Sequence, residues 1–338
     1  MRKIATAVLP AMVKPALVMV LAGALPALAQ TPAGDPPQPT ETVTATAAPL
    51  TDAAIQEFVK THTAPSQITG KIPRWARGIC VRTQGLPSAL GDAVTSRIKA
   101  VIREIGAPLA PETCDFNAAI FFDARPQEVL DDIAARAPDL LGYHEAAQAK
   151  SVATIRHPVQ AWYATQTRDL RGVVLHDVPD PSVLCDTVDM DVMSANLPLV
   201  GGGRVDFNKY KVALESKAEK CSPRRVTGNR LRDGLTSEFA NVTVVASLDT
   251  LNKHQLAPVA DYIALLMLSQ TQAFDTCQKM DSIANLLVPG CDFANSLKGL
   301  TAGDLAYLKA IYRADAGGTL VMQQQAIANE MKKLLAEK

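Results

Sequence analysis

The chain has 338 residues, of which 48% are hydrophobic, and it carries 34 basic and 34 acidic side chains. The balanced charge argues against a general nucleic-acid binder, which needs an excess of Lys and Arg to displace counterions, and against a polybasic membrane-binding surface. The length and the hydrophobic content fit one large domain or two small ones.

The first 29 residues have the order of a secretory signal peptide. Three basic residues precede the apolar run 16–25, and the small residues of 27–29 follow it. This order predicts export to the periplasm or out of the cell, with cleavage after Ala29. The run is too short to cross about 30 Å of hydrocarbon, so it is a poor membrane anchor. We also expect no transmembrane segment in the mature chain.

Residues 30–71 are expected to form a disordered leader with one short helix. The stretch 30–50 is rich in Pro and Thr and has no apolar period, which is typical of a chain that cannot build a core. Thr51 can then cap a helix that ends near Thr61.

The first half of the expected globular domain, 72–315, alternates between strand and helix signals. Apolar positions of 88–105 recur every three or four residues, which indicates an amphipathic helix, and Pro126 suits the first turn of another. In chain order we expect a strand at 78–84, the helix at 88–105, a strand at 117–123 and the helix from Pro126. This alternation indicates a β–α–β unit.

The second half is less regular up to about Arg225 and then regains clear signals. Thr301 and Asp304 have the spacing of a capping box at a helix start. Residues 316–338 are expected to form an amphipathic helix docked on the core, with a partner-binding helix as the alternative. The other expected elements are strands at 159–165, 173–177 and 241–247 and helices at 255–269 and 301–312. Together they predict a single α/β or α+β domain with a mixed sheet and packed helices.

All six cysteines follow the predicted signal peptide. An even number of cysteines in an exported chain indicates disulfides, and six cysteines allow fifteen connectivities. No CxxC motif occurs, which argues against metal binding by the thiols. Sequential pairing is the simplest hypothesis, and it joins Cys80 to Cys114, Cys185 to Cys221 and Cys277 to Cys291.

The few large aromatic residues include some that stand near arginines. Trp75 follows Arg74, and the pair Trp162 and Tyr163 precedes Arg168. Such groups can line a ligand groove through stacking or cation–π contacts, and half-buried strand aromatics are the alternative. We therefore take Trp75, Trp162 and Tyr163 as candidate groove residues.

One stretch comes close to the zinc motif HExxH. It reads HEAAQ, so that Gln148, a poor zinc ligand, stands where the second histidine belongs. His157 could assist, but Pro158 places it outside a regular helix. These residues define an alternative hypothesis, a metal-dependent hydrolase with a site around His144, Glu145 and His157.

The segment 300–312 reads LTAGDLAYLKAIY, and it follows a strand at 241–247 and an apolar helix at 259–269. This order resembles the end of the matrixin-like metzincin peptidases, in which a zinc-binding helix precedes a helix of pattern LTxxDxxxLxxLY. The front part, from Ile72 to the strand at 117–123, is compatible with the same fold. The whole chain also resembles a group of uncharacterised exported proteobacterial proteins.

The resemblance implies a zinc-binding helix at 259–269, but this helix contains no His and no Glu. His254 stands one turn too early, and Asp261 alone cannot assemble a site, because a metzincin needs three ligands and a Glu as general base. The resemblance therefore implies a degenerate scaffold with no metal, no cofactor and no catalytic residues. We expect a non-catalytic exported protein that binds a ligand in a peptidase-like cleft or associates with an envelope protein partner.

Overall fold

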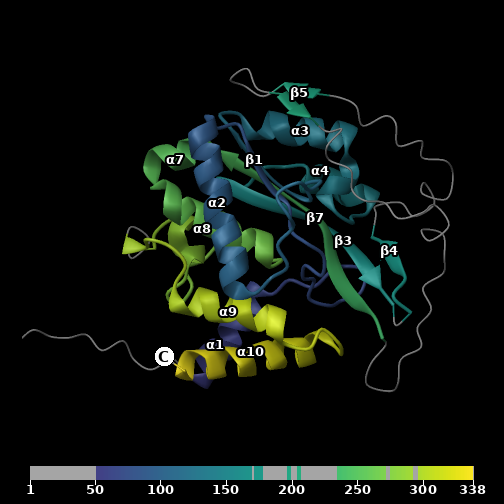
Figure 1. Ribbon diagram of the computed structural model, residues 1–338, viewed down its shortest axis with the longest axis vertical. Helices are drawn as coiled ribbons and strands as arrows, with labels where there is room; N and C mark the ends of the chain where they lie inside the picture. Colours follow the sequence, from purple (N-terminus) through teal and green to yellow (C-terminus); the bar gives the residue numbers. More distant parts are fainter. Residues whose placement is uncertain are drawn as a thin grey trace, which may run out of the picture. The chain divides into compact units, whose positions relative to one another are not determined.

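A computed structural model of the chain describes residues 51–169, 171–177, 196–198, 204–206, 234–271, 275–291 and 296–337. The predicted signal peptide and the first part of the predicted leader lie outside these residues. The described residues contain a five-stranded mixed sheet with helices packed on it, which confirms the predicted α/β class (Figure 1).

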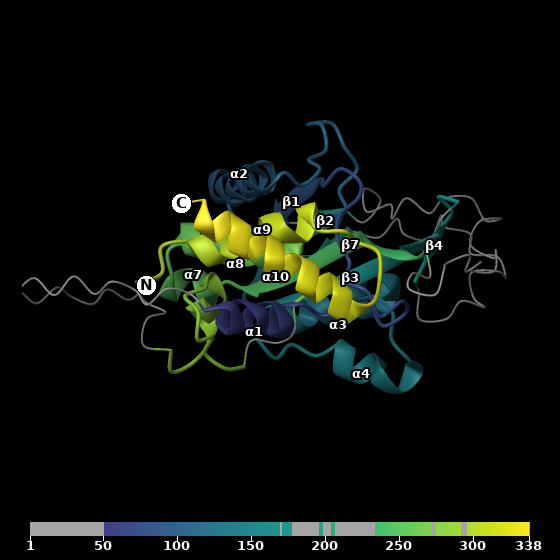
Figure 2. The same ribbon diagram turned by 90° about the horizontal axis from the view of Figure 1, so that it is seen from below.

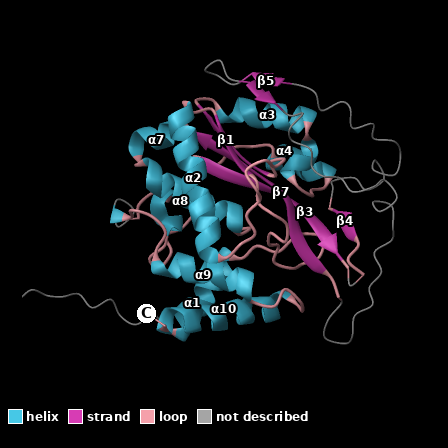
Figure 3. Cartoon of the chain, in the orientation of Figure 1, coloured by secondary structure: helices cyan, strands magenta, loops and turns pink. Residues whose placement is uncertain are grey.

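The five strands of the sheet lie in the order β1-β2-β7-β3-β4. β1, β2 and β7 are parallel, whereas β3 is antiparallel to β7 and β4 is antiparallel to β3. The strands are β1 (Val81–Gln84), β2 (Ala118–Asp123), β3 (Val159–Arg168), β4 (Val174–His176) and β7 (Thr236–Ser247). Two further strands, β5 (Asn196–Pro198) and β6 (Arg204–Asp206), pair only with each other among the described residues (Figure 3).

The central strands are apolar on both faces, as expected for strands that helices cover from both sides. Every residue of β2 is buried, and so is nearly all of β7. β7 begins at Thr236, five residues before the predicted strand, because the polar side chains of Ser237 and Glu238 are also buried there beside β3.

One face of the sheet is covered by α2 (Ser88–Ile105) and α8 (Leu256–Leu268), which pack against each other. α2 turns its predicted apolar stripe to this core, including Val94, Ile98 and Ile105. α8 is apolar all round and buried along nearly its whole length, because α9 (Ala302–Arg313) and the 3₁₀ helix η5 (Ile283–Leu287) enclose it further.

The opposite face is covered by α3 (Pro126–Arg136) and the 3₁₀ helix η1 (Pro138–Leu141), where Leu130 and Ile133 pack with Phe121 of β2. The short helices η2 (Ala146–Gln148) and α4 (Ala149–Val152) follow, and α2 and α4 lie on opposite sides of the strands in Figure 2. β2 thus leads into a helix on this face, whereas its neighbour β7 leads into α7 (Asp249–Lys253) and α8 on the other.

The first and last helices of the described chain, α1 (Asp52–His62) and α10 (Leu320–Ala336), pack against each other (Figure 2). Thr51 caps α1 as predicted, and its Oγ1 accepts a hydrogen bond from the backbone N–H of Ala54 at 3.2 Å. The side chains of Phe58 and Val59 are buried in the main core. Lys332 of α10 forms an ion pair with Asp52 at 2.6 Å.

These contacts change the expected domain boundaries. Residues 51–71 were expected in a disordered leader and 316–338 in a separate terminal helix, whereas the described parts of both belong to the same compact unit as the sheet. The amphipathic helix near the C-terminus is docked on the core, because Ile327 and Met331 are buried beside α9.

Two of the three predicted disulfides lie in the described residues, and both are confirmed. Cys80 is bonded to Cys114, and Cys277 is bonded to Cys291. The predicted pair Cys185 and Cys221 lies outside the described residues. Among the helices that the structure describes, none has both the length and the apolar character needed to cross a membrane.

Candidate functional site

Two adjoining pockets lie where β7 ends and β3 begins, and they share Arg156 and His157 in their walls. The first, which we call the edge pocket, has a volume of about 340 Å³. Its walls are residues 159–163 of β3, the residues Ser151, Val152, Arg156 and His157 that precede β3, and Tyr262, Leu266 and Thr271 on the side of α8.

The second pocket, which we call the end crevice, has a volume of about 630 Å³. It opens beyond the carboxyl end of β7, between the start of α3 and the short helix α7. Its walls are formed by four segments of the chain. They are Pro126, residues 155–158, residues 286–291, and a fourth segment with Ser247, three residues of α7 (Asp249, Thr250 and Lys253) and its C-cap His254.

The edge pocket runs along a side of β3 that no described strand covers. Pro158 accepts a hydrogen bond from Ser247 of β7 at 2.8 Å, so alternate residues from Pro158 onwards face β7. Val159, Ala161 and Tyr163 therefore direct their backbone N–H and C=O groups to the outer edge.

The open part of this edge has a defined length. β4 pairs with β3 only from Gln166 onwards. At Tyr163 the edge is closed, because a Cβ on Gly142 would lie 2.1 Å from the carbonyl oxygen of Tyr163. The backbone can approach this closely only because Gly142 has no side chain and adopts φ = 78°. The open edge therefore extends from Val159 to Trp162, roughly 10 Å.

The two aromatic residues predicted on β3 both line the edge pocket. The indole N–H of Trp162 donates to the carbonyl of Val152 at 2.8 Å, and the hydroxyl of Tyr163 donates to the carbonyl of Leu266 at 2.9 Å. Burial raises the pKa of Tyr163 to about 12, so its phenol stays neutral at physiological pH. Both rings are thus held in place as walls rather than poised for proton transfer.

Trp75, the third predicted groove residue, lies elsewhere. It is only 2% exposed, its indole N–H donates to the carbonyl of Met267 at 2.8 Å, and its ring lies 5.5 Å from that of Phe239. It lines neither pocket. Trp75 is thus packed in the core, where its neighbours in the fold, rather than the nearby arginine, set its environment.

The end crevice contains several basic side chains. Arg156 and Lys253 are exposed, and neither forms an ion pair with a carboxylate within the described part of the chain. The guanidinium of Arg156 is held by Ser151, with Nη2 2.6 Å from Oγ. His157 lies 3.6 Å from the carboxylate of Asp275, and Asp249 is the acidic member of the wall.

The residues of the alternative metal hypothesis do not gather into a site. No group of three or more His, Cys, Asp or Glu that could hold a metal occurs among the residues that the structure describes. His144 is buried and its Nδ1 donates to the carbonyl of Gly142 at 2.8 Å, while Glu145 caps η2. His157 lies in the wall shared by the two pockets.

Asp261, in the helix where the resemblance implies a zinc site, has a structural partner. Both of its carboxylate oxygens accept hydrogen bonds from Arg97 of α2, at 2.6 and 2.8 Å, and one also accepts the backbone N–H of Leu300 at 3.0 Å. This carboxylate is 1% exposed and joins α8 to α2 and to the chain before α9. It is therefore a packing residue.

The motif at 300–312 also serves the fold. Thr301 and Asp304 form the predicted capping box of α9. Asp304 is fully buried, where it also accepts hydrogen bonds from the hydroxyl of Ser282 at 2.6 Å and the backbone N–H of Ile283 at 2.8 Å. The hydroxyl of Tyr307 donates to the carbonyl of His62 at 2.9 Å, which ties α9 to α1.

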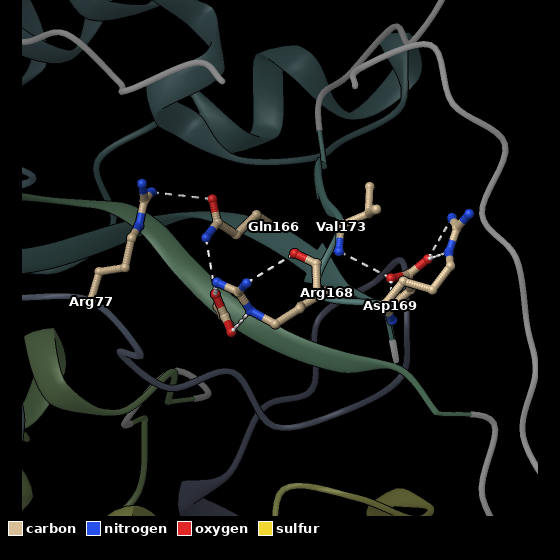
Figure 4. A network of polar contacts seen from close by, with 8 residues as sticks. Arg77, Gln166, Arg168, Asp169 and Val173 are labelled. Atoms are coloured by element: carbon tan, nitrogen blue, oxygen red, sulfur yellow. Dashed lines mark hydrogen bonds and ion pairs between the residues drawn. The ribbon is translucent and has the colours of Figure 1, made fainter. Parts of the chain in front are cut away.

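A second polar cluster occupies the other end of β3 and β7 (Figure 4). Glu238 accepts two hydrogen bonds from Arg168, at 2.6 and 3.0 Å, and one from Gln166 at 3.0 Å. Arg77 donates to Gln166 at 3.3 Å, and Asp169 accepts two backbone N–H groups of the turn that follows it. The acidic groups are thus satisfied within the cluster, which joins the strand ends.

Comparison with protein-family models, with curated protein sequences and with solved structures gives no significant match. The two pockets therefore stand on their own geometry. Sequence reasoning missed Arg156, Lys253 and Thr250, because the end crevice is assembled from four separate segments and no local motif joins them.

Proposed function

We propose that this protein is an exported, non-catalytic binding protein that holds an extended polypeptide segment against the open edge of β3. The observation that carries the proposal is the stretch from Val159 to Trp162, which has no strand partner on its outer side among the described residues and lines the edge pocket.

An extended segment suits this edge because it would complete the pattern of the sheet. Strand addition supplies main-chain hydrogen bonds for affinity, and neighbouring pockets select alternate side chains. Here the outward backbone groups of Ala161, which is partly exposed, offer the hydrogen bonds. The edge pocket beside them, walled by Trp162, Tyr163 and Leu266, has room for an apolar side chain of the segment.

The lack of a described strand partner along this edge supports a binding role. Proteins usually protect edge strands with charges, prolines, bulges or covering segments, because an open edge pairs with other chains. Between Val159 and Tyr163 only Gln160 is polar, and its side chain is bonded to its own neighbours, to the N–H of Arg156 at 2.8 Å and the carbonyl of Thr154 at 3.3 Å. Within the described part of the chain the edge therefore has no such protection, and it is framed by fixed aromatic side chains.

The location supports an extracytoplasmic partner. The bonds Cys80–Cys114 and Cys277–Cys291 fit an oxidising compartment. With the predicted signal peptide, this favours the periplasm or the outside of the cell, and a segment of an envelope protein as the partner.

The test compares two substitutions at one position in the full, disulfide-intact protein. Ala161→Pro removes the outward N–H but leaves the ladder to β7, and an edge position tolerates proline. Ala161→Val keeps the N–H and serves as the matched control. Binding is measured against an array of immobilised ten-residue peptides of mixed sequence, and the affinities of the bound peptides are then determined in solution.

We expect Ala161→Pro to weaken peptide binding at least tenfold and Ala161→Val to retain it, with melting temperatures within a few degrees of each other. N-methylation of alternate residues of a bound peptide should reproduce the loss, because it removes the opposite partner of the same hydrogen bonds. Equal binding by the two variants, or no peptide bound by the parent protein, would contradict strand addition.

A further inference from the structure

We propose that the end crevice binds a carboxylate group of the ligand, so that the protein selects acidic segments. That the carboxylate belongs to a polypeptide segment on β3, as a side chain or as its carboxyl end, rests on the proposed function. The carboxylate site itself rests on the crevice alone, on its place in the sheet, its charges and one buried hydroxyl.

The place of the crevice is the one where open α/β sheets hold ligands. Such ligands lie beyond the carboxyl ends of parallel strands, where neighbouring strands lead to helices on opposite faces. β2 and β7 are parallel neighbours that diverge in this way, β2 to α3 and β7 to α7. Pro126 at the start of α3 and Asp249 at the start of α7 both line the crevice.

The charges of the crevice match a single carboxylate. Two permanent cations, Arg156 and Lys253, face one acid, Asp249, and the imidazoles of His157 and His254 add ring N–H groups. Asp275, which lies 3.6 Å from His157, is the other charged group at this wall. Among the described residues that line the crevice, the permanent cations outnumber the acid by one, and Asp275 is paired with His157, which suits a monoanion better than a doubly charged phosphate.

The guanidinium of Arg156 gives this site its geometry. It is a planar group with five N–H donors, and a carboxylate can accept two of them in parallel. Ser151 Oγ takes only one donor, at 2.6 Å from Nη2, and so holds the group in position without neutralising it. Arg156 also belongs to both pockets, so one ligand can reach from the edge of β3 into the crevice.

Thr250 provides an independent observation. Its side chain is 3% exposed and lies in the wall of the crevice, and its Oγ1 has no hydrogen-bond partner among the described residues. A buried hydroxyl without a partner is costly, and most are satisfied in folded proteins. A carboxylate oxygen that reached Thr250 from the crevice would supply the acceptor that this hydroxyl lacks.

The test uses the full, disulfide-intact protein and two probes. The first is succinate, with inorganic phosphate as the comparison. The second is a pair of bound array peptides that differ only by Glu against Gln. Binding of both probes is measured with three proteins. They are the parent protein, the double variant Arg156→Gln with Lys253→Gln, and the single variant Lys150→Gln. The last variant removes an exposed cation of α4 that lines neither pocket.

We expect the parent protein and Lys150→Gln to bind succinate more tightly than phosphate and the Glu peptide at least tenfold more tightly than the Gln peptide. The double variant should lose both preferences, because charge-assisted hydrogen bonds supply them. A Glu preference that persists in the double variant, or tighter binding of phosphate, would overturn the carboxylate site.

The two proposals fail in different ways. Peptides that bind without a Glu preference would remove the carboxylate site and leave strand addition intact. Succinate binding that depends on Arg156 and Lys253, without any peptide binding, would support the carboxylate site and contradict the proposed function.

Discussion

The buried imidazole of His62 should make the protein sensitive to acid. His62 stands in the last turn of α1, is fully buried, and stacks on Phe58 with ring centroids 3.8 Å apart. Its Nδ1 donates to the carbonyl of Phe58 at 2.8 Å, and the ring of Tyr307 lies 5.9 Å away. Burial lowers the pKa of His62 from 6.5 to about 4.

The direction follows from the two protonation states. Above pH 6.5 the imidazole is neutral in both the folded and the unfolded chain, and its contribution to stability is complete. Between pH 6.5 and about 4 the unfolded chain binds a proton that the folded chain does not. The free energy of unfolding therefore decreases as the pH is lowered. At 1.36 kcal/mol for each pH unit, the loss from His62 reaches about 3 kcal/mol at pH 4.

The perturbation is His62→Phe, which keeps a ring against Phe58 but cannot take a proton. Urea unfolding of the parent protein and the variant is followed at pH 7.5, 5.5 and 4. Loss of the hydrogen bond to Phe58 lowers the stability of the variant at every pH, by about 1 kcal/mol.

The decisive quantity is the difference in pH dependence between the two proteins. The parent protein should lose about 3 kcal/mol more than His62→Phe between pH 7.5 and 4. Gln56→Ala, at an exposed position of α1 that carries no titratable group, serves as the control and should follow the parent curve. Parallel curves for the parent and His62→Phe would refute the reasoning.

Two further perturbations test the parts of the fold that hold the site. Replacing Cys277 and Cys291 by Ser opens a loop closed across 14 residues, which should lower the free energy of unfolding by about 3 kcal/mol. Because Cys291 lines the end crevice, the affinity for succinate should also fall. The same replacement at Cys80 and Cys114 should leave this affinity unchanged. Equal effects of the two replacements on succinate binding would contradict the prediction. Asp304→Asn should cost about 1–3 kcal/mol, because the buried carboxylate holds Ser282 and the start of α9. The control Asp281→Asn, at an exposed side chain, should stay within about 0.5 kcal/mol of the parent, and a similar loss there would argue against the assigned role of Asp304.

The elements with clear periodicity could be predicted from the sequence. The helix at 88–105 agrees with α2 in its bounds. Ser88 is its first residue, although Pro87 rather than Ser88 is the N-cap, and Gly106, with φ = 76°, ends it in the left-handed conformation that glycine favours. The strand at 117–123 agrees with β2 to within a residue, since every one of its side chains is buried. In these cases the local pattern and the tertiary environment demand the same structure.

The misjudged positions are those where packing decides. Trp75 and Trp162 are both tryptophans near arginines, yet Trp75 is enclosed by Met267 and Phe239, whereas Trp162 lies on a strand beside a pocket. The leader helix carried a usable signal, because Ile55, Phe58, Val59 and His62 repeat at helical spacing and mark a buried face. The preceding Pro- and Thr-rich stretch obscured that signal.

The candidate site could be predicted only in part. Trp162 and Tyr163 lie on one strand and are visible in the sequence. The end crevice unites residues near 126, 156, 250 and 288, so its existence depends on the order of the strands in the sheet. No local period carries that information.

The contact between α1 and α10 has a consequence for the timing of folding. The first helix of the compact unit rests on the last, with Lys332 paired to Asp52 and Gln324 Nε2 bonded to Thr63 Oγ1 at 2.9 Å. A chain that emerges from its N-terminus therefore exposes the apolar face of α1 until the final helix follows. Completion of the core is thereby delayed to the end of synthesis.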